Sequence, residues 1–81
     1  MDINSIITEI KNYIELNILA SDVKIDANTN LQDAGIDSFS TVEIILFIER
    51  QYGVVITDDK LVPENFKTLN ALAATVMELT K

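Results

Sequence analysis

The sequence predicts an all-α domain with four helical segments, the third of them short. Three observations favour this class. Three stretches carry apolar residues at spacings of three and four, the period of an amphipathic helix. Only two Gly and one Pro occur in 81 residues, fewer than an all-β fold with many tight turns would need. The β-branched run at residues 54–56 is too short, and too isolated, to predict a sheet.

The first helix is predicted over residues 3–19. Asp2 or Asn4 can cap its start, because short polar side chains accept hydrogen bonds from the first turn of a helix. Its apolar stripe consists of Ile3, Ile6, Ile7, Ile10 and Ile14.

Residues 20–37 are predicted to form a long connection, because turn-forming Ser, Asp, Asn and Thr side chains are frequent there. Loops of this length are unusual in compact domains and are often functional. Gly35 is expected to supply a backbone conformation that other residues resist. The anchors of the loop are Val23, Ile25, Leu31, Ala34 and Ile36.

The second helix is predicted over residues 38–52, with Gly53 as its stop. Residues 54–56 are interpreted as a buried connection, and a short helical segment then begins at Thr57 or Asp58 and runs to about Asn65. Pro63 is compatible only with the first turn of a helix. The last helix is predicted over 68–80, capped by Thr68, with an apolar stripe made of Leu69, Leu72, Ala73, Val76 and Leu79.

Two apolar stripes run along the second helix when it is unrolled at about 100° per residue. Ile44, Ile45, Ile48 and Tyr52 form the stripe expected to face the core. Phe39, Val42 and Leu46 form a second stripe on the side of Ser38, bordered by Glu43, Glu49 and Arg50. A second stripe edged with charge indicates a surface for a partner. The alternative is that this helix is central and buried on nearly all sides.

Composition narrows the functional classes. Thirteen Asp and Glu outweigh six Lys and Arg, and the net charge of −7 argues against nucleic-acid binding. A negative net charge favours partners with basic patches, although a charge of this size also serves simply to keep a small protein soluble. No N-terminal signal segment and no apolar run of about 18 residues are present, so we expect a free-standing domain over residues 1–81 that is cytoplasmic, monomeric and does not span a membrane.

Ser38 lies at the start of a helix, directly after Asp37. The chain has no His and no Cys, which excludes a Ser-His-Asp triad or a Cys-His pair within it. A serine presented in this way without a base indicates a residue that another protein modifies. The alternative role for both Asp37 and Ser38 is helix capping.

Residues 31–45, LQDAGIDSFSTVEII, resemble the acyl and peptidyl carrier protein family, and residues 48–54 and the final helix continue the match. The resemblance implies a four-helix bundle with a short third helix. It implies that Ser38 accepts 4′-phosphopantetheine from coenzyme A through a phosphopantetheinyl transferase, and that Asp37 helps this transferase bind coenzyme A and its metal. A non-catalytic carrier of acyl or aminoacyl thioesters, in fatty acid or specialised biosynthesis, is therefore expected.

The resemblance also assigns partner contacts, which would be made with a loading ligase or transferase and with downstream synthase enzymes. These contacts are assigned to Phe39, Val42, Glu43, Leu46 and Glu49, while Asp58 and Asp59 either extend the acidic surface or cap a helix. Ser40 and Arg50 stand where fatty acid carriers usually have acidic residues, so the recognition face is less acidic here. The cargo stays open among fatty acyl, polyketide, aminoacyl and D-alanyl groups. The rival hypothesis is a helical adaptor that keeps this fold without modification.

Overall fold

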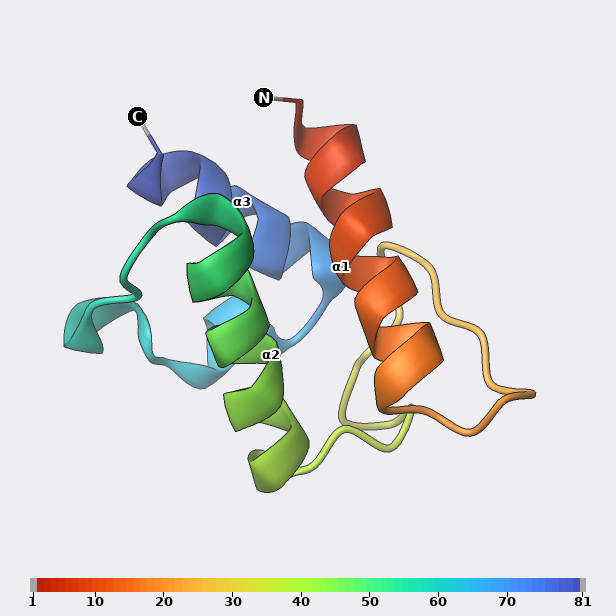
Figure 1. Ribbon diagram of the computed structural model, residues 1–81. Helices are drawn as coiled ribbons and strands as arrows, with labels where there is room; N and C mark the ends of the chain where they lie inside the picture. Colours follow the sequence, from red (N-terminus) through yellow and green to blue (C-terminus); the bar gives the residue numbers. More distant parts are fainter. Residues whose placement is uncertain (1, 81) are drawn as a thin grey trace.

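The computed structural model describes residues 2–80, and in that range it contains helices and no strand. The long helices are α1 (Ile3–Asn17), α2 (Ser38–Tyr52) and α3 (Leu69–Leu79). Two short 3₁₀ turns, η1 (Asp58–Lys60) and η2 (Pro63–Phe66), lie between α2 and α3 (Figure 1). The predicted all-α fold is confirmed. None of the described helices is long and apolar enough to cross a membrane.

The core lies where the three long helices face one another. The predicted stripe of α1 supplies three fully buried isoleucines, and the predicted inner stripe of α2 supplies two. The largest fully buried side chains are Ile6, Ile10, Ile14, Leu31, Ile44, Ile48, Leu69, Leu72 and Val76. Removing this apolar surface from water is the main force that holds the helices together.

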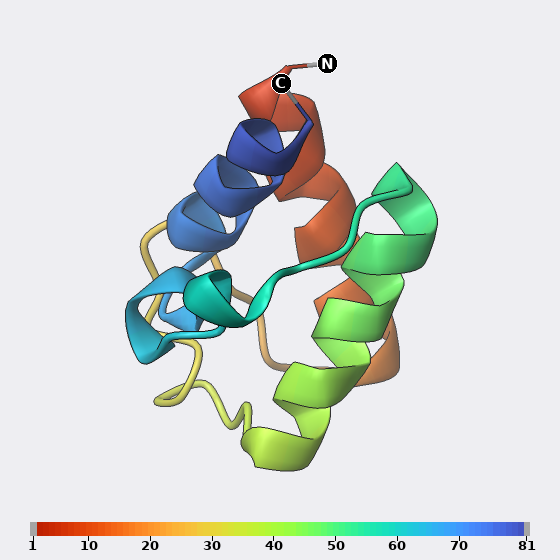
Figure 2. The ribbon, with the colours of Figure 1, turned by 90° about the vertical axis from the view of Figure 1, so that its left-hand side faces the viewer.

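Helix α2 is joined to α1 by two aromatic contacts. The rings of Tyr13 and Phe47 stack with their centroids 4.1 Å apart. At the last residue of α2, the Tyr52 hydroxyl donates a hydrogen bond to Glu9 Oε1 over 2.6 Å. Helix α3 also packs against α1, and the chain after Tyr52 crosses from the end of α2 toward α3 (Figure 2).

Four of the five predicted anchors of the connection between α1 and α2 lie in or against the core. Ile25, Leu31 and Ile36 are buried and Ala34 packs against them, whereas Val23 is only half-buried outside this cluster. The backbone N–H of Leu31 donates to the carbonyl oxygen of Lys67 over 2.9 Å, which ties the loop to the end of η2. Gly35 adopts a φ of +110°, a conformation that side chains with a Cβ disfavour, and so turns the chain toward α2.

Four local predictions need correction. Helix α1 ends at Asn17 instead of residue 19, and Asp2 occupies its N-cap position without a side-chain hydrogen bond. The short helical segment is broken into two 3₁₀ turns, because Pro63 can only begin a new turn and does so in η2. Within the connection at 54–56, Ile56 is buried, whereas the Val55 side chain is 73% exposed.

Candidate functional site

Ser38 is the first residue of α2, and its exposed side chain is presented by the capping of that helix. Asp37 occupies the N-cap position, where its Oδ1 accepts the backbone N–H of Ser40 over 2.8 Å. The Thr41 hydroxyl donates to the carbonyl oxygen of Asp37 over 2.9 Å. The Ser38 hydroxyl has no hydrogen-bond partner among residues 2–80, so it is free to meet another molecule.

The capping contact also sets the ionisation of Asp37. The backbone N–H of Ser40, together with its hydroxyl, lowers the pKa of the Asp37 carboxyl below its ordinary value. Asp37 is therefore an anion at neutral pH, at the end of the helix where negative charge is stabilised. Capping, one of the two roles considered for Asp37, is confirmed, and capping is not done by Ser38.

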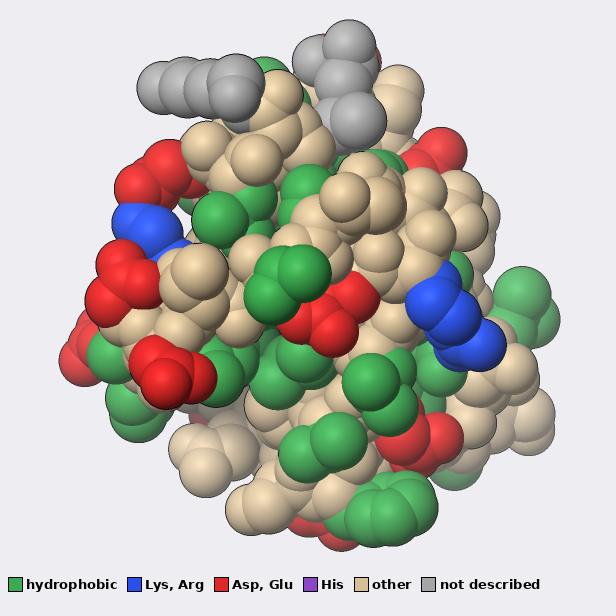
Figure 3. Space-filling model, turned by 60° about the vertical axis from the view of Figure 1, so that its left-hand side comes forward, with side chains coloured by type: hydrophobic (Ala, Val, Ile, Leu, Met, Phe, Trp, Pro, Cys, Tyr) green, Lys and Arg blue, Asp and Glu red, His purple; other side chains and the backbone are tan. Residues whose placement is uncertain are grey.

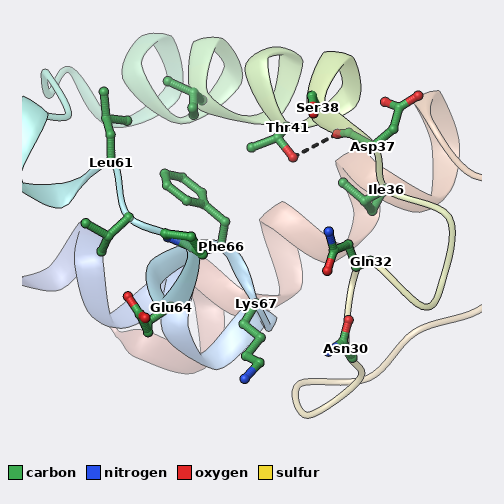
Figure 4. A pocket seen from close by; sticks show the side chains of 13 residues that line it. Asn30, Gln32, Ile36, Asp37, Ser38, Thr41, Leu61, Glu64, Phe66 and Lys67 are labelled. Carbon is green, nitrogen blue, oxygen red and sulfur yellow. Dashed lines mark hydrogen bonds between the residues drawn. The ribbon is translucent and has the colours of Figure 1, made fainter.

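A groove of about 490 Å³ opens beside Ser38. One wall is formed by the first turns of α2, and the opposite wall by residues 61–67, with residues 30–36 at one end (Figure 4). Its lining mixes apolar and polar side chains: Asn30, Gln32, Ile36, Asp37, Ser38, Thr41, Ile45, Leu61, Val62, Pro63, Glu64, Phe66 and Lys67.

The second apolar stripe of α2 faces solvent. Phe39 is 74% exposed, and Val42 and Leu46 are each 53% exposed. Figure 3 shows hydrophobic side chains gathered on this side of the molecule, with acidic side chains among and around them. The alternative in which α2 is buried on nearly all sides is wrong, because its apolar residues divide between the core and this exposed surface.

The acidic residues assigned to partner contacts lie in different environments. Glu43 is half-buried beside the exposed stripe. Glu49 is also half-buried, and its Oε2 accepts the backbone N–H of Ile56 over 2.9 Å, so this carboxylate is engaged within the protein. Asp58 and Asp59 are exposed on η1, and the hydroxyl of Thr57 lowers the pKa of Asp59 below its ordinary value.

This arrangement presents a nucleophile without the means to activate it. No side chain among residues 2–80 accepts the proton of the Ser38 hydroxyl, and that part of the chain contains no cluster of three potential metal ligands. General-base activation needs a group within hydrogen-bond reach of the hydroxyl. Among residues 2–80, no side chain is placed to act as a general base for the Ser38 hydroxyl.

The groove was not anticipated by sequence reasoning, although the serine and the exposed stripe were. Its far wall is formed by Leu61, Val62 and Phe66, which lie more than twenty residues after Ser38. The only signal in the sequence was an apolar pair, Leu61 and Val62, placed just before Pro63, where a helix cannot continue.

Comparison with known proteins gives a consistent result. Residues 8–76 match the family model described as a phosphopantetheine attachment site. The chain is 35% identical over 74 residues to aminoacyl carrier protein 1 of Bradyrhizobium diazoefficiens, covering 91% of this chain and 80% of that protein. It is 29% identical over 67 residues to acyl carrier protein 2, chloroplastic, of Spinacia oleracea, covering 82% of this chain and 48% of that protein.

A similar solved structure comes from a crystal of Bradyrhizobium japonicum glycine:[carrier protein] ligase, complexed with its cognate carrier protein and an analogue of glycyl adenylate. The match has a TM-score of 0.74 at 33% identity and covers 94% of this chain and 96% of that chain. A second crystal, of the same ligase complexed with glycylated carrier protein, matches with a TM-score of 0.71 at 32% identity, over 90% of this chain and 96% of that chain.

Proposed function

This chain belongs to the phosphopantetheine-binding acyl carrier protein family, and we propose that Ser38 is the residue to which its 4′-phosphopantetheine is attached. The observation that carries this proposal is an exposed serine hydroxyl without an internal partner, at the N-terminus of a fifteen-residue helix and at the edge of a groove. The partial positive charge at that end of the helix favours a phosphate. When bound, the group supplies a thiol that holds an acyl group as a thioester.

Asp37 is proposed to assist the transferase that modifies Ser38. Its carboxylate is ionised and exposed beside the serine, and its Oδ2 atom is not used by the cap. An available carboxylate oxygen is a suitable ligand for Mg²⁺, which usually binds through one or two carboxylates together with substrate phosphates. The transferase would supply the base that residues 2–80 lack around Ser38.

We propose that the cargo is an aminoacyl group, loaded by an aminoacyl ligase. The supporting likeness is to aminoacyl carrier protein 1 and to a chain crystallised with a glycine ligase. The groove supports the same choice, because seven of its thirteen lining residues carry polar or charged side chains. A long hydrocarbon chain would bury these polar groups without hydrogen bonds, which costs free energy, whereas a short aminoacyl group would not.

Docking is proposed to involve the exposed stripe of Phe39, Val42 and Leu46 with the neighbouring Glu43. Exposed apolar residues beside carboxylates are complementary to an enzyme surface that combines an apolar patch with Lys or Arg. Asp58 and Asp59 on η1 add negative charge to the chain after α2. We place this carrier in the cytoplasm, acting as a monomer that visits its transferase, its ligase and downstream synthase enzymes in turn.

The test is the intact mass of the protein after incubation with coenzyme A, Mg²⁺ and a broad-specificity phosphopantetheinyl transferase. We expect a gain of one phosphopantetheine in the wild type and in Ser40→Ala, and no gain in Ser38→Ala. The Ser40→Ala variant is the matched control, because it removes a hydroxyl two residues away in the same turn. Loading of Ser38→Ala would refute the site, and a folded wild type that gains no mass would favour the unmodified adaptor.

The cargo is tested separately on the loaded protein. The Bradyrhizobium glycine ligase, supplied with ATP and glycine, is expected to add one glycyl residue to the modified chain. A long-chain acyl-transferring enzyme supplied with its own donor should add its group more slowly. Faster transfer of the long acyl group would refute the aminoacyl assignment and leave the attachment site unaffected.

A further inference from the structure

Glu49 makes a hydrogen bond that its place on the helix surface does not suggest. Its Oε2 accepts the backbone N–H of Ile56 over 2.9 Å, four residues after α2 ends at Tyr52. The Ile56 side chain is only 6% exposed, so this hydrogen bond holds the backbone of a residue whose side chain is part of the core. Within residues 2–80 it is the only hydrogen bond that joins α2 to the segment 54–67.

That segment forms the far wall of the groove beside Ser38, through Leu61, Val62 and Phe66 (Figure 4). Apart from the Glu49–Ile56 hydrogen bond, the polar contacts described for this segment go to parts of the molecule other than α2. The Lys67 carbonyl oxygen accepts the N–H of Leu31, and the Lys60 ammonium pairs with Glu78 of α3. The two walls of the groove therefore belong to separately held parts of the molecule, with the Glu49–Ile56 hydrogen bond between them.

The same arrangement occurs at the end of α1, a helix to which no partner contact is assigned. Glu15 Oε2 accepts the backbone N–H of Ile25 over 2.9 Å, and the Glu15 side chain is only 11% exposed. Ile25 is buried, as Ile56 is. In both cases a glutamate near the end of a long helix accepts a hydrogen bond from the backbone N–H of a buried isoleucine in the connection that follows.

We propose that Glu49 is a positioning residue that sets the separation of the two groove walls beside Ser38, instead of a residue that contacts partner enzymes. The role depends on a carboxylate oxygen that accepts an N–H and not on negative charge at the surface. This inference rests on the proposed attachment at Ser38 for its importance, since the groove borders that residue, but the contact exists in the unmodified chain.

Three variants separate the effect of the hydrogen-bond acceptor at Glu49 from the effect of its negative charge. Glu49→Gln loses the charge and keeps an oxygen that can accept the Ile56 N–H. Glu49→Ala loses both. Glu43→Gln is the matched control, because it removes a charge six residues away on the same helix from a side chain that makes no hydrogen bond within residues 2–80. All three are compared with the wild type in the unmodified form.

The first measurement is amide hydrogen exchange at Ile56, with Ile25 as the internal reference for global unfolding. We expect Glu49→Ala to speed exchange at Ile56 relative to Ile25 by about tenfold or more, the scale of losing a hydrogen bond to a charged acceptor. Glu49→Gln should restore most of the protection. Methyl resonances of Leu61 and Val62 should shift in Glu49→Ala and lie close to their wild-type positions in Glu49→Gln.

The second measurement is the KM of the transferase for each unmodified variant. We expect Glu43→Gln to raise KM and Glu49→Gln to leave it near the wild-type value. The proposal is overturned if Glu49→Gln raises KM as Glu43→Gln does, or if Glu49→Ala leaves Ile56 exchange and the groove methyls unchanged. Either result leaves loading at Ser38 standing, whereas failure of the wild type to gain mass refutes the attachment site without altering the exchange result.

Discussion

Asp37 caps α2, and we propose that the same carboxylate also assists the transferase. Asn caps helices about as well as Asp, whereas Ala does not. We therefore expect Asp37→Asn to keep the thermal stability of the wild type and Asp37→Ala to lower it, since only Ala loses the hydrogen bond from Ser40. Both should slow modification by the transferase, because both lose the carboxylate. Thermal unfolding together with the initial rate of mass gain measures the two roles.

A different pattern would assign Asp37 to capping alone. If Asp37→Asn is modified at the wild-type rate and only Asp37→Ala is slow, the rate of modification depends on whether the first turn of α2 is well formed. It then does not depend on the negative charge beside Ser38. The proposed part of Asp37 in binding coenzyme A and its metal would then be wrong.

At the scale of the element, the apolar residues of α2 lie in two environments, the core and the exposed stripe, and substitutions should distinguish their effects. Ile48 is fully buried, so Ile48→Ala should cost about 2–5 kcal/mol of unfolding free energy. Leu46 is 53% exposed, and Leu46→Arg should change stability by no more than about 0.5 kcal/mol. The same Leu46→Arg substitution, or Glu43→Lys, should weaken transfer by a basic partner enzyme. Chemical denaturation and loading kinetics on the same samples test the expectation.

The opposite outcome has a clear meaning. If Leu46→Arg loses stability and partner activity in equal measure, then Leu46 contributes to the fold and the exposed stripe is not a docking surface. Ile48→Ala supplies the comparison, because it should lose activity only to the extent that the protein unfolds.

At the scale of the whole molecule, three exposed carboxylates make the free energy of unfolding depend on pH in the acidic range. Hydrogen bonds from the backbone N–H of Asn28, from that of Ser40 and from the Thr57 hydroxyl hold the pKa values of Asp26, Asp37 and Asp59, respectively, below the ordinary value. A depressed pKa in the folded state adds stability above the ordinary value of 3.8, and this is lost as pH falls through the folded pKa. Above that range the chain has no His to titrate, so the free energy of unfolding should change little between pH 5 and pH 7.

The protein is therefore expected to keep its stability near neutrality and to lose it in acid. The melting temperature should stay nearly constant between pH 7 and pH 5 and fall between pH 4 and pH 2. Thermal scans in buffers of equal ionic strength would show it. A melting temperature that rises below pH 4 would mean that relief of the repulsion within a chain of net charge −7 outweighs the loss of the three hydrogen-bonded carboxylates.

Sequence reasoning recovered what depends on the period of a helix and missed what depends on the path of the chain between helices. The stripe at Ile6, Ile10 and Ile14 and the two stripes of α2 follow from geometry within one helix. The position of Glu49 on α2 was equally readable, but its contact with Ile56 requires knowing how the chain returns after Gly53. The groove was missed for the same reason, since its far wall comes from a broken, irregular segment.

The pairing of Tyr52 with Glu9 gives this molecule an optical signal of its own. The chain has no Trp and two Tyr, and both Tyr side chains lie in the contact between α1 and α2. A tyrosine hydroxyl bonded to a carboxylate emits weakly, because the excited phenol gives its proton to the acceptor. Any event that lifts α2 from α1 should therefore brighten the ultraviolet emission of the protein, so that the separation of these helices can be followed in real time without attaching a dye.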